Sequence, residues 1–194
     1  MIAKLVLPLL FLLHLAVAEE TEAAFEKAGI VPDLLDVAPN TTLSVHFAKK
    51  GKKADLGNEL RLSEVAEQPA VEWENDGGLY TLVKVDPDAL SRTNPIYRSW
   101  LHWLVVNVPG DAVREGHEVA AYKGAGAPPK TGLHRYVFLV FKQQTPIGRE
   151  ALNGIDGDHR KNFDLRAFAK KNKLGDPIAG NFYEAQHEEQ RTRE

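Results

Sequence analysis

Alternating and continuous apolar stretches set the character of this chain. Leu43, Val45 and Phe47 alternate with polar residues, which is the pattern of a strand with one buried face. Two longer apolar stretches, at 100–108 and 135–141, are rich in aromatic and β-branched residues. Such stretches are typical of central strands that are covered on both faces, so the pattern predicts a sheet with a buried middle.

Shorter apolar stretches between turn residues add further strands and few helices. The additional strands are expected at 71–73, 79–85 and 178–183. Asp164 is expected to cap a helix that Gly175 stops, and another short helix is expected over 22–28. Many strands with few helices favour a mainly β fold, an antiparallel β-sandwich with a few short peripheral helices.

The first 18 residues have the features of a secretory signal peptide. Lys4 precedes an apolar stretch over 5–15, and Ala16-Val17-Ala18 is a small-x-small cleavage site. The stretch is too short to span a bilayer. We therefore expect cleavage after Ala18 and a secreted, extracellular protein with a single domain over 19–194. A buried N-terminal helix is the alternative interpretation.

Composition narrows the class of protein. The chain has 194 residues, of which 43% are hydrophobic, and this suits one domain with a core of its own. It has no cysteine, and its formal net charge of -3 gives no indication of nucleic-acid binding. We expect a monomer. In the secretory path, the triplet Asn40-Thr41-Thr42 would make Asn40 a glycosylation site.

Two carboxylates leave the predicted strand at 79–85 together. Asp86-Pro87-Asp88 follows it directly, and Pro87 ends the ladder of strand pairing. In an extended stretch, residues 86 and 88 point the same way. An ordinary solvated turn is the alternative, because Asp and Pro are common turn residues.

One histidine lies inside an apolar stretch. Simple alternation places His102 on the same face as Trp100 and Leu104. A carboxylate from Asp86 or Asp88 is expected to hold an imidazole in its charged form. If that imidazole is His102, its pKa should lie above the usual value.

A second histidine follows a loop that is rich in Gly, Ala and Pro. His134 comes directly after the loop at 123–132, which can offer backbone N–H groups to an anion. Imidazole and backbone donors together predict a pocket for phosphate. Aromatic walls from Trp100, Tyr122 and Tyr136 would add apolar contact and cation–π attraction for a ligand ammonium group.

The order of these motifs resembles the phosphatidylethanolamine-binding protein family, also called the Raf kinase inhibitor family. Its first signature is similar to Tyr80-Thr81-Leu82-Val83, Asp86-Pro87-Asp88-Ala89, Ser91-Arg92, Tyr97-Arg98 and the stretch from Trp100 to Asn107. Its second is similar to Tyr122, Gly124, Pro128-Pro129, Thr131-Gly132 and His134-Arg135-Tyr136-Val137-Phe138. A third, shorter similarity is Gly157-Asp158-His159-Arg160 with Phe163. The resemblance extends over residues 34–183.

The resemblance implies a β-sandwich with a small anion pocket at one end and no cofactor or metal. The family's pocket positions fall here on Asp86, Asp88, Tyr97, Trp100, His102, Tyr122, Gly124, Gly126, His134 and Tyr136, with Phe163 nearby. Leu90 and Ala127 depart from the pattern, because the family usually has proline at both positions.

The implied function is non-catalytic binding of phosphatidylethanolamine or another phosphate-bearing small ligand, with peripheral membrane contact for a lipid. Alternatives are a secreted serine protease inhibitor, another protein-regulating module, or a carrier of an apolar ligand or odorant. A metal-dependent hydrolase is less favoured, because the histidines and aspartates show no recognised ligand spacing. No G-x-S-x-G motif surrounds a serine.

Overall fold

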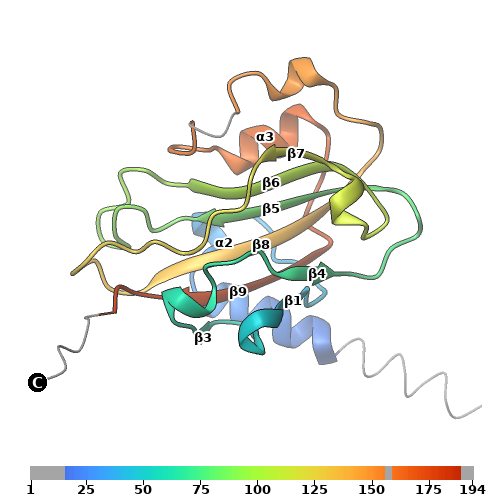
Figure 1. Ribbon diagram of the computed structural model, residues 1–194. Coiled ribbons are helices and arrows are strands. Elements are labelled where there is room, and N and C mark those ends of the chain that lie inside the picture. Colours follow the sequence, from blue (N-terminus) through green and yellow to red (C-terminus); the bar gives the residue numbers. More distant parts are fainter. Residues whose placement is uncertain (1–15, 156–158, 189–194) are drawn as a thin grey trace, which may run out of the picture.

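Two β-sheets stack in the structure, a computed structural model that describes residues 16–155 and 159–188. Among these residues, the strands form a three-stranded sheet of order β2-β1-β4 and a six-stranded sheet of order β3-β9-β8-β5-β6-β7. The strands are β1 Ser44–Phe47, β2 Lys52–Lys53, β3 Asn58–Glu59, β4 Ala70–Glu72, β5 Leu79–Asp86, β6 Trp100–Pro109, β7 His117–Ala120, β8 His134–Gln143 and β9 Ala179–Ala185. Figure 1 shows β6, β5, β8 and β9 of the large sheet side by side. The expected mainly β fold is confirmed.

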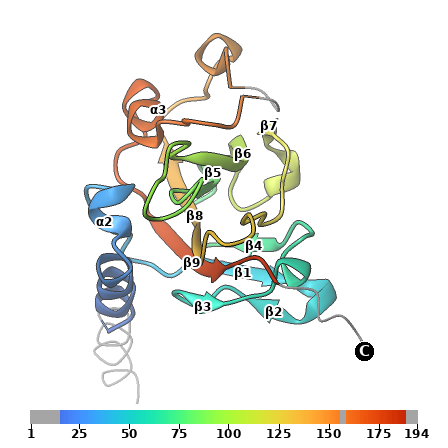
Figure 2. The ribbon, with the colours of Figure 1, turned by 90° about the vertical axis from the view of Figure 1, so that its left-hand side faces the viewer.

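Helices cover one face of the large sheet and the small sheet lies on the other (Figure 2). The helices are an N-terminal helix, described over 16–27, then α2 Ile30–Asp33 and α3 Leu165–Lys171, with 3-10 turns η1 Ala48–Lys50, η2 Leu62–Glu64, η3 Val113–Glu115 and η4 Arg149–Leu152. The N-terminal helix thus begins before residue 22, where it was expected to start.

The start of α3 is as expected. The Asp164 side chain caps it by accepting a hydrogen bond from the Ala167 N–H at 2.9 Å. The helix ends at Lys171, before the expected stop at Gly175, and there the Asn172 side chain donates to the Phe168 carbonyl at 2.9 Å. The Asn172 backbone N–H also donates to this carbonyl, at 3.1 Å, so Asn172 closes the end of the helix with two donors.

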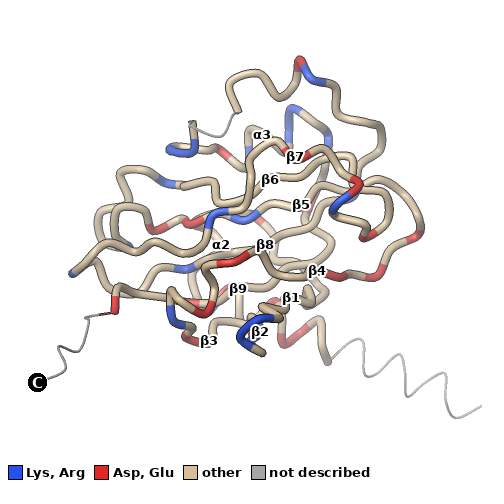
Figure 3. Tube along the Cα trace, in the orientation of Figure 1, with Lys and Arg blue, Asp and Glu red and all other residues tan. Residues whose placement is uncertain are grey.

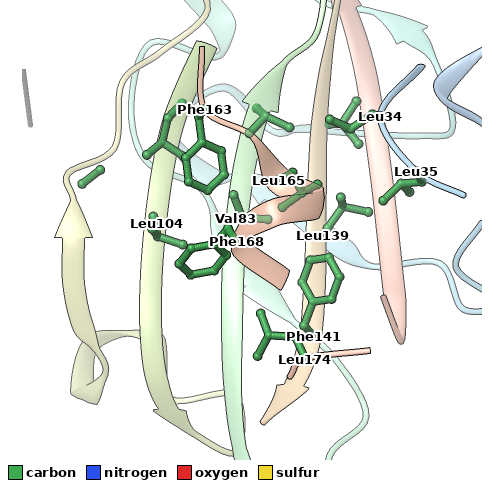
Figure 4. Packing of buried hydrophobic residues seen from close by; sticks show 14 of the residues in the cluster. Leu34, Leu35, Val83, Leu104, Leu139, Phe141, Phe163, Leu165, Phe168 and Leu174 are labelled. Carbon is green, nitrogen blue, oxygen red and sulfur yellow. The ribbon is translucent and has the colours of Figure 1, made fainter. Parts of the chain in front are cut away.

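Alternation along β5 divides the core into two clusters. Val83 and Val85 face the helices, whereas Tyr80 and Leu82 face the small sheet. All four are buried, so β5 is a central strand with both faces covered. Figure 4 shows the helix side, where side chains from and around α3 lie over the strands: Phe163, Leu165, Phe168 and Leu174 above Val83, Leu104, Leu139 and Phe141.

β6 departs from simple alternation at His102 and Trp103. The register between β5 and β6 shifts at this point, so that β6 carries an extra residue. A β-bulge of this kind turns two consecutive side chains toward one face. Trp103 belongs to the cluster on the small-sheet side, and the His102 ring meets Tyr136 of that same cluster. Leu104 instead joins the helix-side cluster, so the expectation that it shares a face with His102 is wrong.

One strand pairing differs from the expected antiparallel arrangement. β3 runs parallel to β9, with Asn58 opposite Tyr183. The chain reaches this edge from the small sheet and not through a hairpin with β9. The Asn181 side chain fixes the segment that leads into β3, because its Oδ1 accepts the Leu56 N–H at 2.9 Å.

Candidate functional site

A pocket of about 390 Å³ lies where the end of β5, the start of β6 and the start of β8 meet. Loops that follow these strand ends complete its wall. The lining residues are Asp86, Ala89, Leu90, Tyr97, Trp100, His102, Lys123, Gly124, Gly126, Pro128, His134, Tyr136 and Lys161. All the site residues expected from sequence lie here except Asp88, Tyr122 and Phe163.

The carboxylate of Asp86 faces His134. Asp86 Oδ2 lies 2.9 Å from His134 Nδ1, and Asp86 Oδ1 accepts the Asp88 N–H at 2.7 Å. Both side chains are buried, with His134 only 1% exposed. Because both oxygens of Asp86 have partners, this carboxylate is turned toward the protein and not toward an incoming anion.

The other side of the His134 ring fixes its protonation. Nε2 lies 2.9 Å from Thr131 Oγ1, and the Thr131 hydroxyl donates to the Pro128 carbonyl at 2.8 Å. With that hydrogen in use, Nε2 must carry its own hydrogen and donate to Thr131. The contact between Asp86 and His134 Nδ1 then holds one proton. Burial raises the pKa of Asp86 even though His134 opposes the shift, which favours keeping that proton in the pair.

His102 is a neutral imidazole. Its Nδ1 lies 3.1 Å from the Lys123 carbonyl, which can only accept, so Nδ1 carries the hydrogen. Burial lowers the pKa of His102 well below its usual value, and the nearby Lys84 charge lowers it further. Neither Asp86 nor Asp88 contacts this ring. The expectation that a carboxylate raises the pKa of His102 is therefore wrong, because burial dominates.

The glycine-rich loop packs close to the segment that follows η2. A Cβ at Gly124 would lie 2.8 Å from Ala66 Cα and 2.9 Å from its carbonyl oxygen, so only glycine fits. The Gly126 N–H donates to the Tyr136 hydroxyl at 3.2 Å. Burial raises the pKa of Tyr136, so its phenol stays neutral at physiological pH.

Two lysines at the pocket were not among the residues expected from sequence. Lys123 directly follows Tyr122 in the sequence, and Lys161 lies opposite Tyr97 and Trp100. The Lys161 ammonium is 4.2 Å from the centroid of the Tyr97 ring and 6.0 Å from that of Trp100. Lysines in loops are usually solvated, so no sequence pattern marked these two.

Asp88 lies outside the pocket lining, in an ion-pair network. Its carboxylate receives two hydrogen bonds from the Arg135 guanidinium, at 2.9 and 2.6 Å, and one from the Arg135 N–H at 2.9 Å. Arg92 Nε lies 3.3 Å and Arg98 Nη2 lies 3.8 Å from it. Asp33 of α2 shares Arg135 and Arg98. Asp88 therefore holds the loop at 88–98, which forms one pocket wall, and does not face the cavity.

Tyr122 and Phe163 also lie outside the pocket lining. The Tyr122 hydroxyl donates to the Val65 carbonyl at 2.8 Å and accepts from Lys84 Nζ at 3.1 Å. Phe163 packs in the helix-side cluster, with its ring 5.5 Å from that of Phe168. These side chains support the strands behind the pocket.

A groove of about 990 Å³ between β4 and β7 is larger than the pocket. Its rim carries four carboxylates, from Glu72, Asp111, Glu115 and Glu118. An anion would be repelled there. Elsewhere along the described trace, acidic and basic residues are interspersed (Figure 3).

Metal-binding and membrane-spanning features were also sought over 16–155 and 159–188. In this part of the chain, no three His, Asp or Glu side chains come together in a way that could hold a metal ion. The helices in the same ranges are too short or too polar to cross a bilayer.

Two curated proteins are similar in sequence to most of this chain. The 26 kDa secreted antigen of Toxocara canis is 41% identical over 165 residues, which cover 84% of this chain but only 63% of the antigen. The putative odorant-binding protein A5 of Drosophila melanogaster is 33% identical over 174 residues, which cover 88% of this chain and 82% of that protein.

The fold and the sequence together identify the family. A carboxypeptidase Y inhibitor, solved in complex with its cognate proteinase, shares the fold with a TM-score of 0.73 at 22% identity, over 88% of this chain and 97% of the inhibitor. Residues 35–184, which contain every residue lining the pocket, match the phosphatidylethanolamine-binding protein family. The chain therefore belongs to the phosphatidylethanolamine-binding protein family.

Proposed function

We propose that this protein binds phosphate-bearing small ligands, phospholipid headgroups among them, in the pocket at the ends of β5, β6 and β8. The observation that carries the proposal is the charge arrangement. Asp86 is the one carboxylate in the pocket lining of the described chain, and it is turned to His134. Lys123 and Lys161 line the same cavity, and their ammonium groups can attract a phosphate.

The proposed role is binding without catalysis. Asp86, His134 and Thr131 lie in the order of a hydrolase triad, with both contacts at 2.9 Å. Thr131, however, is not among the residues that line the cavity, and its hydroxyl donates to Pro128. A nucleophile must reach the substrate carbonyl, so this arrangement supports a structural role for the three side chains.

Calorimetric titration with sn-glycerol 3-phosphate tests the proposed function. The wild-type protein should bind, and Lys123→Ala should weaken binding about 3- to 10-fold, because a partly solvated ammonium–phosphate contact is lost. His134→Ala should weaken it by about tenfold or more, because Asp86 loses its partner and its carboxylate is then free to repel the phosphate. His117→Ala on the exposed edge strand β7 is the matched control.

Two results would count against the proposal. The first is no binding by wild type. The second is equal affinity in wild type, Lys123→Ala and a folded His134→Ala. An esterase assay with small acyl esters belongs to the same experiment, and turnover that Thr131→Ala abolishes would contradict the non-catalytic role.

The proposed setting is outside the cell, and a protein partner is the second candidate function. The described end of the predicted signal peptide, at 16–18, adds nothing to the buried core, and a relative is named a secreted antigen. The neighbour named a carboxypeptidase Y inhibitor favours testing inhibition of secreted serine proteases. Slow, tight inhibition that survives Lys123→Ala would place that activity on another surface.

A further inference from the structure

The aromatic wall of the pocket already holds a cation. The Lys161 ammonium lies over the Tyr97 ring at 4.2 Å from its centroid and near the Trp100 ring at 6.0 Å. Both rings line the cavity. Aromatic faces at such distances are where the ammonium group of a ligand would bind. In this chain a protein side chain occupies that place.

The backbone holds Lys161 at the pocket. The residues around it pair with the segment that carries Tyr97 and Trp100. The hydrogen bonds are Leu101 N–H to the Arg160 carbonyl at 2.8 Å, Asn162 N–H to the Tyr97 carbonyl at 3.3 Å and Phe163 N–H to the Ser99 carbonyl at 2.9 Å.

Side chains on either side of Lys161 anchor the same segment. The Arg160 guanidinium is buried and donates to the carbonyls of Leu101, His102 and Ala121 at 2.9 to 3.2 Å. Phe163 is buried in the helix-side cluster. With Arg160 and Phe163 fixed on either side of it, the position of Lys161 over the rings is built into the fold.

Among the described residues, the charges around the cavity leave no partner for a second, ligand-borne cation. Asp86 is paired with His134, and no described carboxylate forms an ion pair with Lys161. Lys123 is a second lysine of the lining and adds positive charge beside the cavity. A ligand ammonium would therefore meet repulsion from two lysines and find its aromatic site filled.

We propose that Lys161 occupies the pocket's aromatic cation site and so selects phosphate esters whose second substituent is uncharged, such as a glycerol, over zwitterionic esters of ethanolamine or choline. This inference rests on the proposed phosphate-binding function and names its ligand class. It differs from the phosphatidylethanolamine ligand that the family resemblance implied.

Three glycerophosphodiesters provide the test, because they share one phosphodiester charge and differ only in the second alcohol. Calorimetry with wild type should show that glycerophosphoglycerol binds about tenfold tighter than glycerophosphoethanolamine or glycerophosphocholine. Lys161→Met keeps an unbranched side chain of nearly the same length without its charge. It should weaken the glycerol ester, strengthen the choline ester and abolish the preference. Lys170→Ala on α3 is the control and should leave all three affinities unchanged.

The outcomes separate the two proposals. Binding of all three esters with equal affinity, or tighter binding of the ethanolamine ester by wild type, overturns the selectivity while the function stands. A preference that Lys161→Met retains also overturns it. Failure of all three esters to bind overturns the function and the selectivity with it.

Vesicles distinguish a lipid ligand from a free ester. If the protein floats with phosphatidylcholine vesicles that contain phosphatidylglycerol and does not float with vesicles of phosphatidylcholine alone, the ligand is a lipid headgroup. Binding of the soluble glycerol ester alone identifies a free metabolite, and both results keep the selectivity. Equal binding to the two kinds of vesicle contradicts it.

Discussion

Protonation of His102 opposes folding. Burial lowers the pKa of its imidazole well below the usual 6.5, so the folded state excludes a proton that the unfolded chain accepts. The unfolded state therefore binds more protons below about pH 6.5, and stability from this group falls as the pH falls through that range. Above that pH the contribution is fully present.

The substitution His102→Asn tests this linkage. Asparagine keeps a donor for the Lys123 carbonyl but does not titrate. Between pH 6.5 and 5, the unfolding free energy of wild type should fall more steeply than that of the variant, by up to about 1.4 kcal/mol per pH unit. Urea denaturation at several pH values measures the two slopes. Parallel slopes would mean that His102 takes up a proton in the folded protein.

Sequence reasoning reached much of the pocket and missed parts that depend on distant contacts. Asp86, His102 and His134 were expected there and line it. Asp88 was also expected, but its partner Arg135 lies 47 residues along the chain, and alternation along one strand cannot reveal such a pair. Lys161 was missed because a loop lysine carries no periodic signal.

The loop at 88–98 is held in place by the ion pairs of Asp88. Burial opposes ionisation of Asp88, but the hydrogen bonds and charge of Arg135 outweigh it and lower the pKa of Asp88. A lowered pKa gives stability that is present above the usual value of 3.8 and is lost as the pH falls through the folded-state value. The pocket wall is therefore expected to loosen in acid.

Asp88→Asn should lower the unfolding free energy by about 3 kcal/mol, because it leaves the buried Arg135 with only the partly exposed Asp33 as a carboxylate partner. Arg92→Ala removes only a half-exposed partner and should cost less than about 1 kcal/mol. Asp76→Asn, which breaks an exposed pair with Lys142, is the control and should change little. Urea denaturation midpoints compare the three variants. A loss of stability in Asp88→Asn no larger than that in Asp76→Asn would contradict the proposed role of Asp88 in holding the loop at 88–98.

At the scale of elements, strand positions were predictable and strand geometry was not. The apolar stretches at 100–108 and 135–141 became β6 and β8, because continuous burial needs continuous apolar residues. The bulge at His102 depends on the register with β5, which no single stretch encodes. β3 is two residues long and has no pattern of its own, so its parallel pairing could not be foreseen.

Among the described residues, the buried core begins downstream of the expected cleavage site. Residues 16, 17, 19 and 20 are exposed, whereas Thr21 and Phe25 are buried in the N-terminal helix. Thr21 Oγ1 lies 2.6 Å from Thr42 Oγ1, a contact that cleavage after Ala18 would leave in place. The domain expected over 19–194 keeps these contacts without the preceding residues.

Secreted protein should therefore begin at Glu19. N-terminal sequencing of material from a secreting cell checks the cleavage. A recombinant chain that begins at Glu19 should unfold with a free energy within about 0.5 kcal/mol of the full chain. Secreted protein that retains Met1, or a shortened chain that loses several kcal/mol, would show that the leader is part of the fold. Asn40 is exposed, and a mass shift on glycosidase treatment of the same material tests its glycosylation.

The most direct test of phosphate binding in this pocket uses the three tryptophans of the chain. Trp100 lines the pocket, while Trp73 is buried in the small-sheet cluster and the Trp103 indole donates to Glu118 at 3.1 Å. Each indole N–H gives its own signal in a ¹⁵N–¹H NMR spectrum. Titration with sn-glycerol 3-phosphate should shift the Trp100 indole signal and the backbone signals of Lys123 to Gly126, saturably, and leave the other two indoles in place. A saturable shift at Trp73 or Trp103 with Trp100 unmoved, or no shift at all, would contradict the account.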